Sequence, residues 1–91
     1  MQNKTKDIIL DDFIHFHFEW NVGKIPVICV YRKPSDYPEK YVARVFDVTT
    51  PTEYVVVKDT LEEIRNAIPK MRFVRFKRRH DDAPEIVESY I

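Results

Sequence analysis

Apolar residues recur at helical spacing in one stretch of the chain, residues 59–69. Its apolar positions lie three or four residues apart, at Leu61, Ile64 and Ile68. Asp59 or Thr60 can cap the first turn through a side-chain oxygen, and a glutamate stands three residues after each of them, as a capping box requires. Pro69 cannot continue a helix. The pattern therefore predicts a helix over residues 59–68 that is about two and a half turns long.

The other apolar stretches have the spacing or the density of β-strands. We expect strands over residues 12–20, 26–32, 41–48, 53–58, 71–78 and 86–91. Only four residues join the third strand to the fourth, which favours an antiparallel hairpin. Apolar and polar side chains alternate within residues 12–20, and the density of aromatic residues there favours a strand. The alternative is a helix with an apolar face made of Leu10, Phe13, Ile14 and His17.

These elements predict an α+β fold in which four strands, the helix and two further strands follow one another along the chain. The expected sheet is antiparallel, with five to six strands, and the short helix (59–68) packs on one of its faces. Strands lie about 4.8 Å apart and a helix is about 10 Å across, so one helix cannot cover such a sheet. Residues 26–32 and 53–58 are nevertheless apolar on both faces. Either the sheet curls around the helix or a partner buries the second face, and we favour the partner.

Length and charge narrow the class of protein. A chain of 91 residues, 44% of them hydrophobic, fits a single small globular domain over residues 1–91, with residues 1–7 as a flexible polar tail. Basic and acidic residues each number 15, so no net charge attracts nucleic acid or an anionic membrane. We recognise no signal-peptide core and no membrane-spanning segment, so we expect a cytoplasmic protein. A single cysteine, Cys29, excludes an internal disulfide and agrees with that location.

The only glycine, Gly23, excludes several functions. Phosphate-binding loops and dinucleotide-binding turns each need several glycines to bring backbone amides close to a phosphate. A nucleophile elbow built on glycines is excluded for the same reason. We therefore assign no catalytic residue and expect no cofactor.

Two histidines and a glutamate form a candidate metal site. On a strand over residues 12–20, His15, His17 and Glu19 have the same parity and would point to one face. Two imidazoles and a carboxylate suit zinc with an open fourth position, which could activate a water molecule. The alternative is that these residues form the solvated face of an amphipathic strand.

Basic and aromatic residues are interleaved in residues 70–79, which contain no acid. The candidate nucleic-acid-binding residues are Arg72, Phe73, Arg75, Phe76, Lys77, Arg78 and Arg79. Proteins that bind single strands use cations for the phosphates and aromatic rings for the bases. Phe73 and Phe76 have opposite parity on a strand, so one of them should be buried. The alternative is a structural role, in which the cations pair with acidic residues that follow in the sequence.

The lack of a catalytic pattern favours a non-catalytic module for protein–protein interaction or regulation, which acts through an uncovered sheet face or a sheet edge. The expected partner is a second copy of the chain, as a homodimer, or another protein. A nucleic-acid-binding protein that uses residues 70–79 is the first alternative. A small metal-dependent enzyme that uses His15, His17 and Glu19 is the second.

Overall fold

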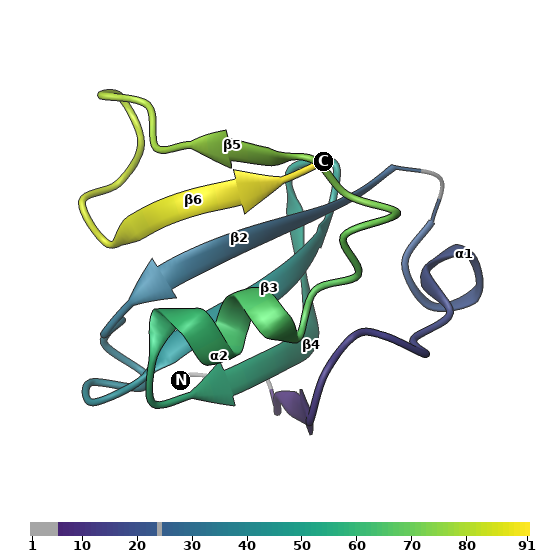
Figure 1. Cartoon of the computed structure of the whole chain (residues 1–91), viewed down its shortest axis with the longest axis horizontal. Helices are drawn as coiled ribbons and strands as arrows, with labels where there is room; N and C mark the ends of the chain where they lie inside the picture. The colour runs from purple at the N-terminus through teal and green to yellow at the C-terminus, as the bar shows by residue number, and fades with distance from the viewer. Residues whose placement is uncertain (1–5, 24) are drawn as a thin grey trace.

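The computed structural model describes residues 6–23 and 25–91, and these contain six strands and two short helices (Figure 1). The strands are β1 (Ile8–Leu10), β2 (Pro26–Arg32), β3 (Tyr41–Asp47), β4 (Thr50–Lys58), β5 (Arg75–Lys77) and β6 (Ile86–Tyr90). The helices are α1 (Phe18–Asn21) and α2 (Leu61–Asn66). The chain is therefore a small α+β fold, as predicted. Residues 1–5 of the predicted tail lie outside the described residues.

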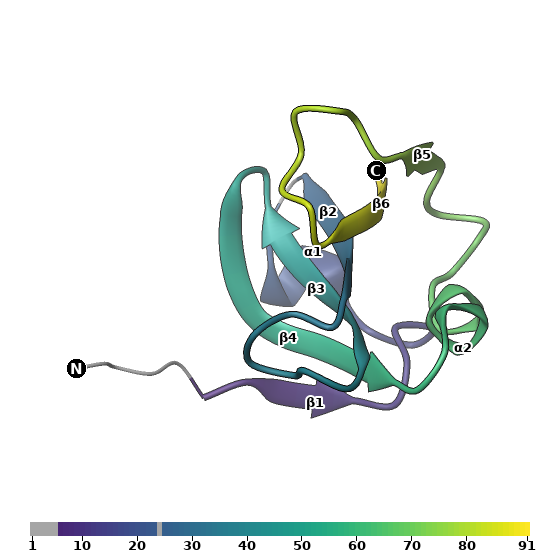
Figure 2. The same cartoon turned by 90° about the vertical axis from the view of Figure 1, so that its left-hand side faces the viewer.

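All the described strands form one sheet, in the order β1-β4-β3-β2-β6-β5. β2 pairs antiparallel with both β3 and β6, and the β3–β4 and β5–β6 pairs are antiparallel as well. β1 instead runs parallel to β4, with Ile8 opposite Tyr54, at the edge of the sheet (Figure 2). The sheet is therefore mixed, and the prediction of a purely antiparallel sheet is wrong. Ile8–Leu10 is a run of three apolar residues without alternation, too short to be recognised as a strand.

The predicted strand over residues 12–20 does not form. The structure has turns there, followed by α1, so the sheet is accompanied by two short helices instead of one. Phe13 and Phe18 are buried while Ile14 is 46% exposed, so burial does not follow alternate positions. The rings of Phe13, Phe16 and Phe18 lie 4.8 to 5.9 Å apart between centroids. A chain that turns can gather these three rings, whereas an extended strand would send Phe13 to the opposite face.

The remaining strands form with shifts at their ends. β2 has the predicted bounds, β3 and β6 each end one residue early, and β4 begins three residues early. The predicted β3–β4 hairpin is confirmed. β5 keeps only three of the residues in the predicted strand 71–78, because the chain turns at 70–72. In that turn, the N–H groups of Arg72 and Phe73 both donate to the carbonyl of Pro69 at 3.2 Å.

α2 is the helix that the sequence predicts over residues 59–68, shortened to Leu61–Asn66. The Oγ1 of Thr60 accepts from the N–H of Glu63 at 3.1 Å, and the Glu63 carboxylate accepts from the N–H of Thr60 at 3.2 Å. This reciprocal pair is the predicted capping box. Ile64 is fully buried between the helix and the sheet, and α2 packs on β3 and β4 (Figure 1). Neither described helix has the length and apolar character needed to cross a membrane.

Aromatic side chains close the end of the core beside α1. The N–H of Phe13 donates to the carbonyl of Ala67 at 2.8 Å, which fixes the turning segment to the end of α2. The ring of Phe18 lies 5.1 Å from that of Phe73, which precedes β5. Residues far apart in the sequence are thus packed together on the α2 side of the sheet, where the main core lies.

A buried carboxylate joins α2 to β5 and β6. Glu88 of β6 is 2% exposed, and Arg65 of α2 donates to both of its oxygens at 2.7 and 3.0 Å. The hydroxyl of Tyr90 donates to it at 2.8 Å and the guanidinium of Arg75 at 3.3 Å. Burial raises the pKa of Glu88, but the hydrogen bonds from Arg65 and its neighbours outweigh burial and hold this pKa below its ordinary value. The ionised carboxylate therefore ties the helix to the far strands of the sheet.

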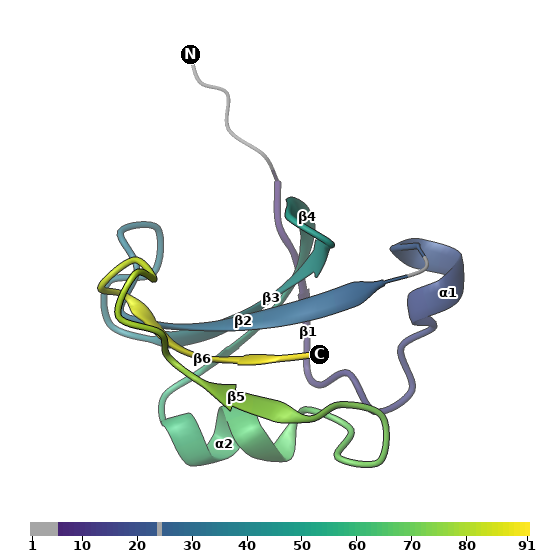
Figure 3. The same cartoon turned by 90° about the horizontal axis from the view of Figure 1, so that it is seen from above.

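The chain itself covers half of the opposite sheet face. Val42 and Val55 point away from the main core, yet they are only 1% and 0% exposed. The loop of residues 33–40 lies over Val42, and its Pro34 lines a small cavity together with Val42. Figure 3 shows this loop, between β2 and β3, and the tip of the β3–β4 hairpin on the side of the sheet opposite α2. The other half of this face, over β2, β6 and β5, is not covered by the described residues.

The Glu88→Gln substitution should destabilise the protein by about 2 kcal/mol at pH 7, because it removes the charge that Arg65 and Arg75 bind. The folded-state pKa of Glu88 lies below its ordinary value of 4.5, so its contribution is present above that pH and is lost as the pH falls through the folded-state pKa. Urea unfolding from pH 7 to pH 3 should therefore show the two proteins converging in stability at low pH. A constant difference across this range would contradict the role given to the Glu88 charge.

The Thr60→Ala substitution should cost about 1 kcal/mol of folding free energy, because the N-cap hydrogen bond of α2 is lost. Asp59→Ala is the matched control, since Asp59 contacts the exposed side chain of Lys40 and does not cap the helix. Thermal unfolding of both variants measures the difference. Equal losses would show that Thr60 is not the functional cap.

Candidate functional site

The uncovered half of the second sheet face gathers exposed apolar side chains. We call it the open face. Its apolar residues that are more than half exposed are Ile25, Val74, Phe76 and Ile91, and Val48, in the β3–β4 turn beside Ile25, is exposed to a similar degree. Their exposed fractions lie between 51% and 62%. A sheet face of this kind is a candidate binding surface, because water does not solvate grouped apolar side chains favourably.

Strand register brings the first part of the open face together. Val74 and Ile91 exchange both of their backbone hydrogen bonds, at 3.0 Å each, and Phe76 lies opposite Ser89. Tyr90, between Ser89 and Ile91, points into the core and is 6% exposed. Because successive side chains of a strand point to opposite faces, Ile91, Val74 and Phe76 point away from the core.

The open face continues across β2 to the end of β3. Val27 of β2 pairs with Phe46 of β3, and both side chains are half-buried on the face opposite the core. Beyond them, the N–H of Val48 donates to the carbonyl of Ile25 at 3.0 Å. The apolar surface therefore crosses four neighbouring strands and ends at the free edge of β5.

The aromatic residues of the stretch 70–79 have different environments. Phe73 is 6% exposed in the core, where its ring packs against Phe18, whereas Phe76 is 51% exposed on the open face. The expectation that one of these two phenylalanines is buried is confirmed. Only Phe76 is placed to contact a ligand without a change in the core.

Arg72 is the first of several basic residues in this stretch that contact the protein itself. Its guanidinium donates to Glu19 at 2.9 Å and lies over the rings of Phe18 and Phe73, with 5.2 and 5.7 Å to the two centroids. It thereby connects α1 to the turn before β5. A phosphate at this site would compete with the carboxylate of Glu19 for the guanidinium of Arg72.

The other cations of the stretch are divided between structural contacts and solvent. Arg75 binds the buried Glu88 at 3.3 Å, Arg79 lies 3.3 Å from an aspartate of the following loop, and Arg78 donates to a carbonyl of that loop at 3.0 Å. The described residues provide no ion pair for Lys77, which is exposed on β5. The predicted basic residues are therefore close in sequence, but they do not form one uniform phosphate-binding surface.

The structure does not place His15, His17 and Glu19 on one strand face, because the chain turns there. The ring of His17 stacks on that of Trp20, with centroids 4.5 Å apart, and Glu19 is paired with Arg72. Across residues 6–23 and 25–91, no group of three His, Cys, Asp or Glu side chains is arranged to hold a metal ion. The predicted zinc geometry required an extended chain that this segment does not adopt.

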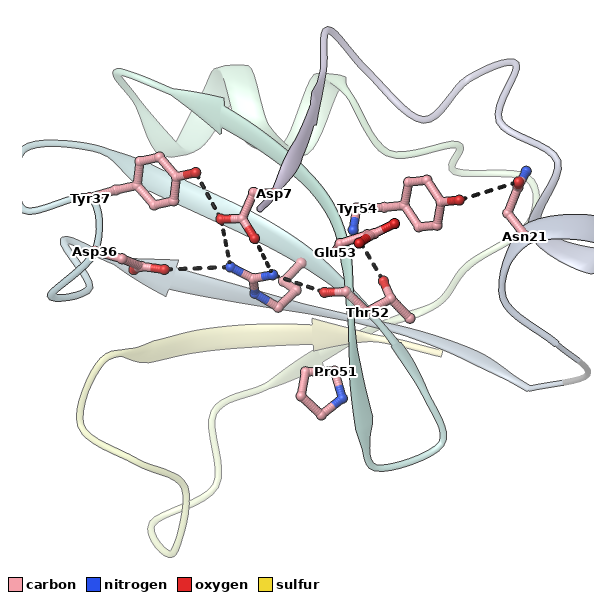
Figure 4. Close-up of a pocket in the computed structure, with 9 residues that line it drawn as sticks. Asp7, Asn21, Asp36, Tyr37, Pro51, Thr52, Glu53 and Tyr54 are labelled. Carbon is pink, nitrogen blue, oxygen red and sulfur yellow. Dashed lines mark hydrogen bonds and ion pairs between the residues drawn. The ribbon is translucent and has the colours of Figure 1, made fainter. Parts of the chain in front are cut away.

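A groove with a volume of about 870 Å³ lies on the other side of β4 from the core (Figure 4). The described residues that line it are Asp7, Asn21, Asp36, Tyr37, Arg44, Pro51, Thr52, Glu53 and Tyr54. They include neither serine, cysteine nor histidine, so this lining offers no nucleophile with an adjacent imidazole base.

Three of the charged groups in the groove, those of Asp7, Asp36 and Arg44, bind one another. Arg44 donates to both oxygens of Asp7 at 3.0 and 3.1 Å and to the carbonyl of Thr52 at 2.8 Å (Figure 4). The hydroxyl of Tyr37 also donates to Asp7, and burial together with this hydrogen bond raises the pKa of Tyr37 to about 12. The cluster therefore attaches the chain before β1 to β3 and to the loop 33–40. Its geometry is that of a group of residues that stabilises the fold.

Comparisons of the chain with protein-family models, with curated proteins and with solved structures found no match. Inference about function therefore rests on the geometry of this chain.

No local pattern along the chain indicates the complete open face. Ile25 and Val48 lie just outside strands, and Ile91 follows the last one. An isolated apolar residue at a strand end is common on protein surfaces, so none of them stands out alone. The useful signal was the apolar character of both faces of residues 26–32, which predicted that the second face of β2 would need a cover.

Because Phe73 is buried and Phe76 is half exposed, their alanine variants should differ strongly in folding stability. Phe73→Ala should destabilise the protein by about 3 kcal/mol or more because it leaves a cavity in the core, whereas Phe76→Ala should cost less than about 1 kcal/mol. Denaturant unfolding of the two variants measures this difference. Similar losses would contradict the placement of Phe76 on an open surface.

Proposed function

We propose that this protein is a non-catalytic interaction module that binds another protein through the open face and the adjoining edge of β5. The observation that carries the proposal is the group of four apolar side chains on one sheet face, each more than half exposed, with the equally exposed Val48 in the turn beside them. Exposed apolar groups of this kind are typical of binding surfaces, and a partner that covers them gains the free energy of removing them from water.

The surroundings of the open face support a protein partner. Protein interfaces usually combine an apolar centre with a polar rim, and they are enriched in aromatic residues and arginine relative to the rest of the surface. Here Phe76 lies at the edge of the apolar group, and basic side chains follow it along the chain. The groove beside β4 supports the non-catalytic part of the proposal, because Arg44 is engaged by Asp7 and the lining offers no nucleophile with an adjacent imidazole.

Nucleic-acid binding is less well supported by the same residues. Arg72 and Arg75 already bind carboxylates, so phosphate binding would have to compete with Glu19 and the buried Glu88. Phe73 would have to leave the core to stack on a base. A nucleic acid would then be left with Phe76 to stack on a base and with Lys77 and Arg78 to bind phosphates. The apolar residues beside them would have no role in such binding.

Replacement of Phe76 by a photoreactive benzophenone amino acid tests the proposal. Irradiation of cells that make this variant should give a discrete covalent adduct with a protein, because the side chain at this position lies in the proposed interface. Denaturing electrophoresis and mass spectrometry identify the adduct. The matched control carries the same amino acid in place of Met71, which is fully exposed but lies in the turn before β5.

An adduct at position 76 that is absent at position 71 would support the proposal. No adduct at position 76, or equal adducts at both positions, would contradict it. An adduct at position 76 that nuclease removes would also contradict it and would favour a nucleic-acid ligand.

A further inference from the structure

The strand pairing shows which backbone N–H and C=O groups of β5 point toward its free edge. It is the last strand of the sheet, next to β6 only (Figure 1). Val74 exchanges both backbone hydrogen bonds with Ile91, so the next residue to do so in an antiparallel ladder is Phe76, opposite Ser89. The N–H and C=O groups of Arg75 and Lys77 therefore point away from β6, toward the free edge. A strand added there would find two residues ready to form hydrogen bonds.

The side chains of β5 divide between the two faces of the sheet. Phe76 belongs to the open face, and Arg75 and Lys77 point to the α2 side, where Arg75 contacts Glu88. Any strand that pairs with this edge therefore meets cations on one face and apolar side chains on the other. The matching sequence alternates acidic with apolar residues.

The charges of β5 disfavour a second copy of the chain at this edge. Antiparallel pairing of two β5 strands about Phe76 would place Arg75 of each chain opposite Lys77 of the other, and like charges in directly opposed positions are destabilising. The surrounding stretch 70–79 carries six basic residues and no acid, which adds to the repulsion. Edge strands commonly use such cations against self-association. The same cations attract an acidic strand.

We propose that the free edge of β5 binds an extended segment of a partner protein, in which acidic residues alternate with apolar ones, as an added strand of the sheet. The inference rests on the proposed function, because it names the chemistry of the protein that the open face binds. The acidic side chains of the segment lie beside Lys77, the cation of β5 that has no ion pair within the described residues, and its apolar side chains extend the surface formed by Val74 and Phe76. Backbone hydrogen bonds give affinity, and the alternating side chains give specificity.

The test uses the full ¹⁵N-labelled chain and a short blocked peptide in which glutamate alternates with valine. Saturating peptide should slow hydrogen exchange at the amides of Arg75 and Lys77 by at least about tenfold, because both become hydrogen-bonded. The amide of Phe76 is an internal control, since it already faces β6 and should change little. A peptide with lysine in place of glutamate should give no protection at the same concentration.

The Lys77→Glu variant tests the contribution of charge. It should weaken binding of the acidic peptide by about fivefold or more, because an attractive cross-strand pair becomes repulsive. Arg79→Glu is the matched control: it makes the same change of charge outside the strand and should have a smaller effect. Lys77 has no ion pair within the described residues, but it lies opposite Glu88, so a new carboxylate there can weaken the fold. The amide spectrum of the variant checks this, and Lys77→Gln, which removes the cation without adding a carboxylate, should also weaken binding, by a smaller factor.

The outcomes separate this inference from the proposed function. Protection of the Arg75 and Lys77 amides by the glutamate peptide alone supports strand addition. A protein adduct at position 76 without any protection of these amides would leave the proposed function in place and overturn strand addition. Equal protection by the lysine peptide would overturn the acidic partner. Displacement of the glutamate peptide by a single-stranded oligonucleotide at low salt, with no protein adduct at position 76, would overturn both.

Discussion

The buried carboxylate of Glu88 is the interaction on which the arrangement of this fold depends. An ionised carboxylate removed from water is costly unless several donors surround it, and here Arg65, Arg75 and Tyr90 all donate to it. These donors belong to α2, β5 and β6, while the main packing of α2 is on β3 and β4. The carboxylate therefore fixes the position of the helix relative to the far strands. The requirement for its donors also orients β5 so that Arg75 points to the core side and Phe76 to the opposite face.

The division of the sheet into a covered and an open part follows from the small amount of chain available. α2 and the aromatic cluster of Phe13, Phe16 and Phe18 cover one face, which leaves the loop 33–40 to cover the other. That loop is held in place through Tyr37, whose hydroxyl binds the carboxylate that Arg44 also binds. Its Pro34 lies beside the buried Val42 of β3, but the loop does not extend over β6 and β5. The open face lies where none of the described segments covers the sheet, and this is the physical basis for the proposed binding of a partner.

In the basic stretch 70–79, the environments of the residues in the structure differ from those that the sequence pattern suggests. Read along the chain, it resembles a surface of cations and rings, but the structure places Phe73 in the core and engages Arg72 with Glu19. What remains accessible is a short edge strand with a cation on either side of Phe76. The function that best fits this remainder is recognition of another strand, because backbone groups, charge and apolar surface are then all used at once.

Local patterns in the sequence were sufficient for the elements that depend on neighbouring residues. The capping box of Thr60 and Glu63 predicted α2, and the apolar runs predicted β2, β3, β4 and β6, because backbone preference and side-chain periodicity act over a few residues. The tertiary structure alone decided the rest. The sequence pattern of residues 12–20 is compatible with either an extended or a turning conformation. Packing of this segment on Phe73 and on the end of α2 selects the turning one. The partners of Glu88 and the grouping of the open face depend on which strands become neighbours, and that choice is set by contacts between distant segments that no local pattern encodes.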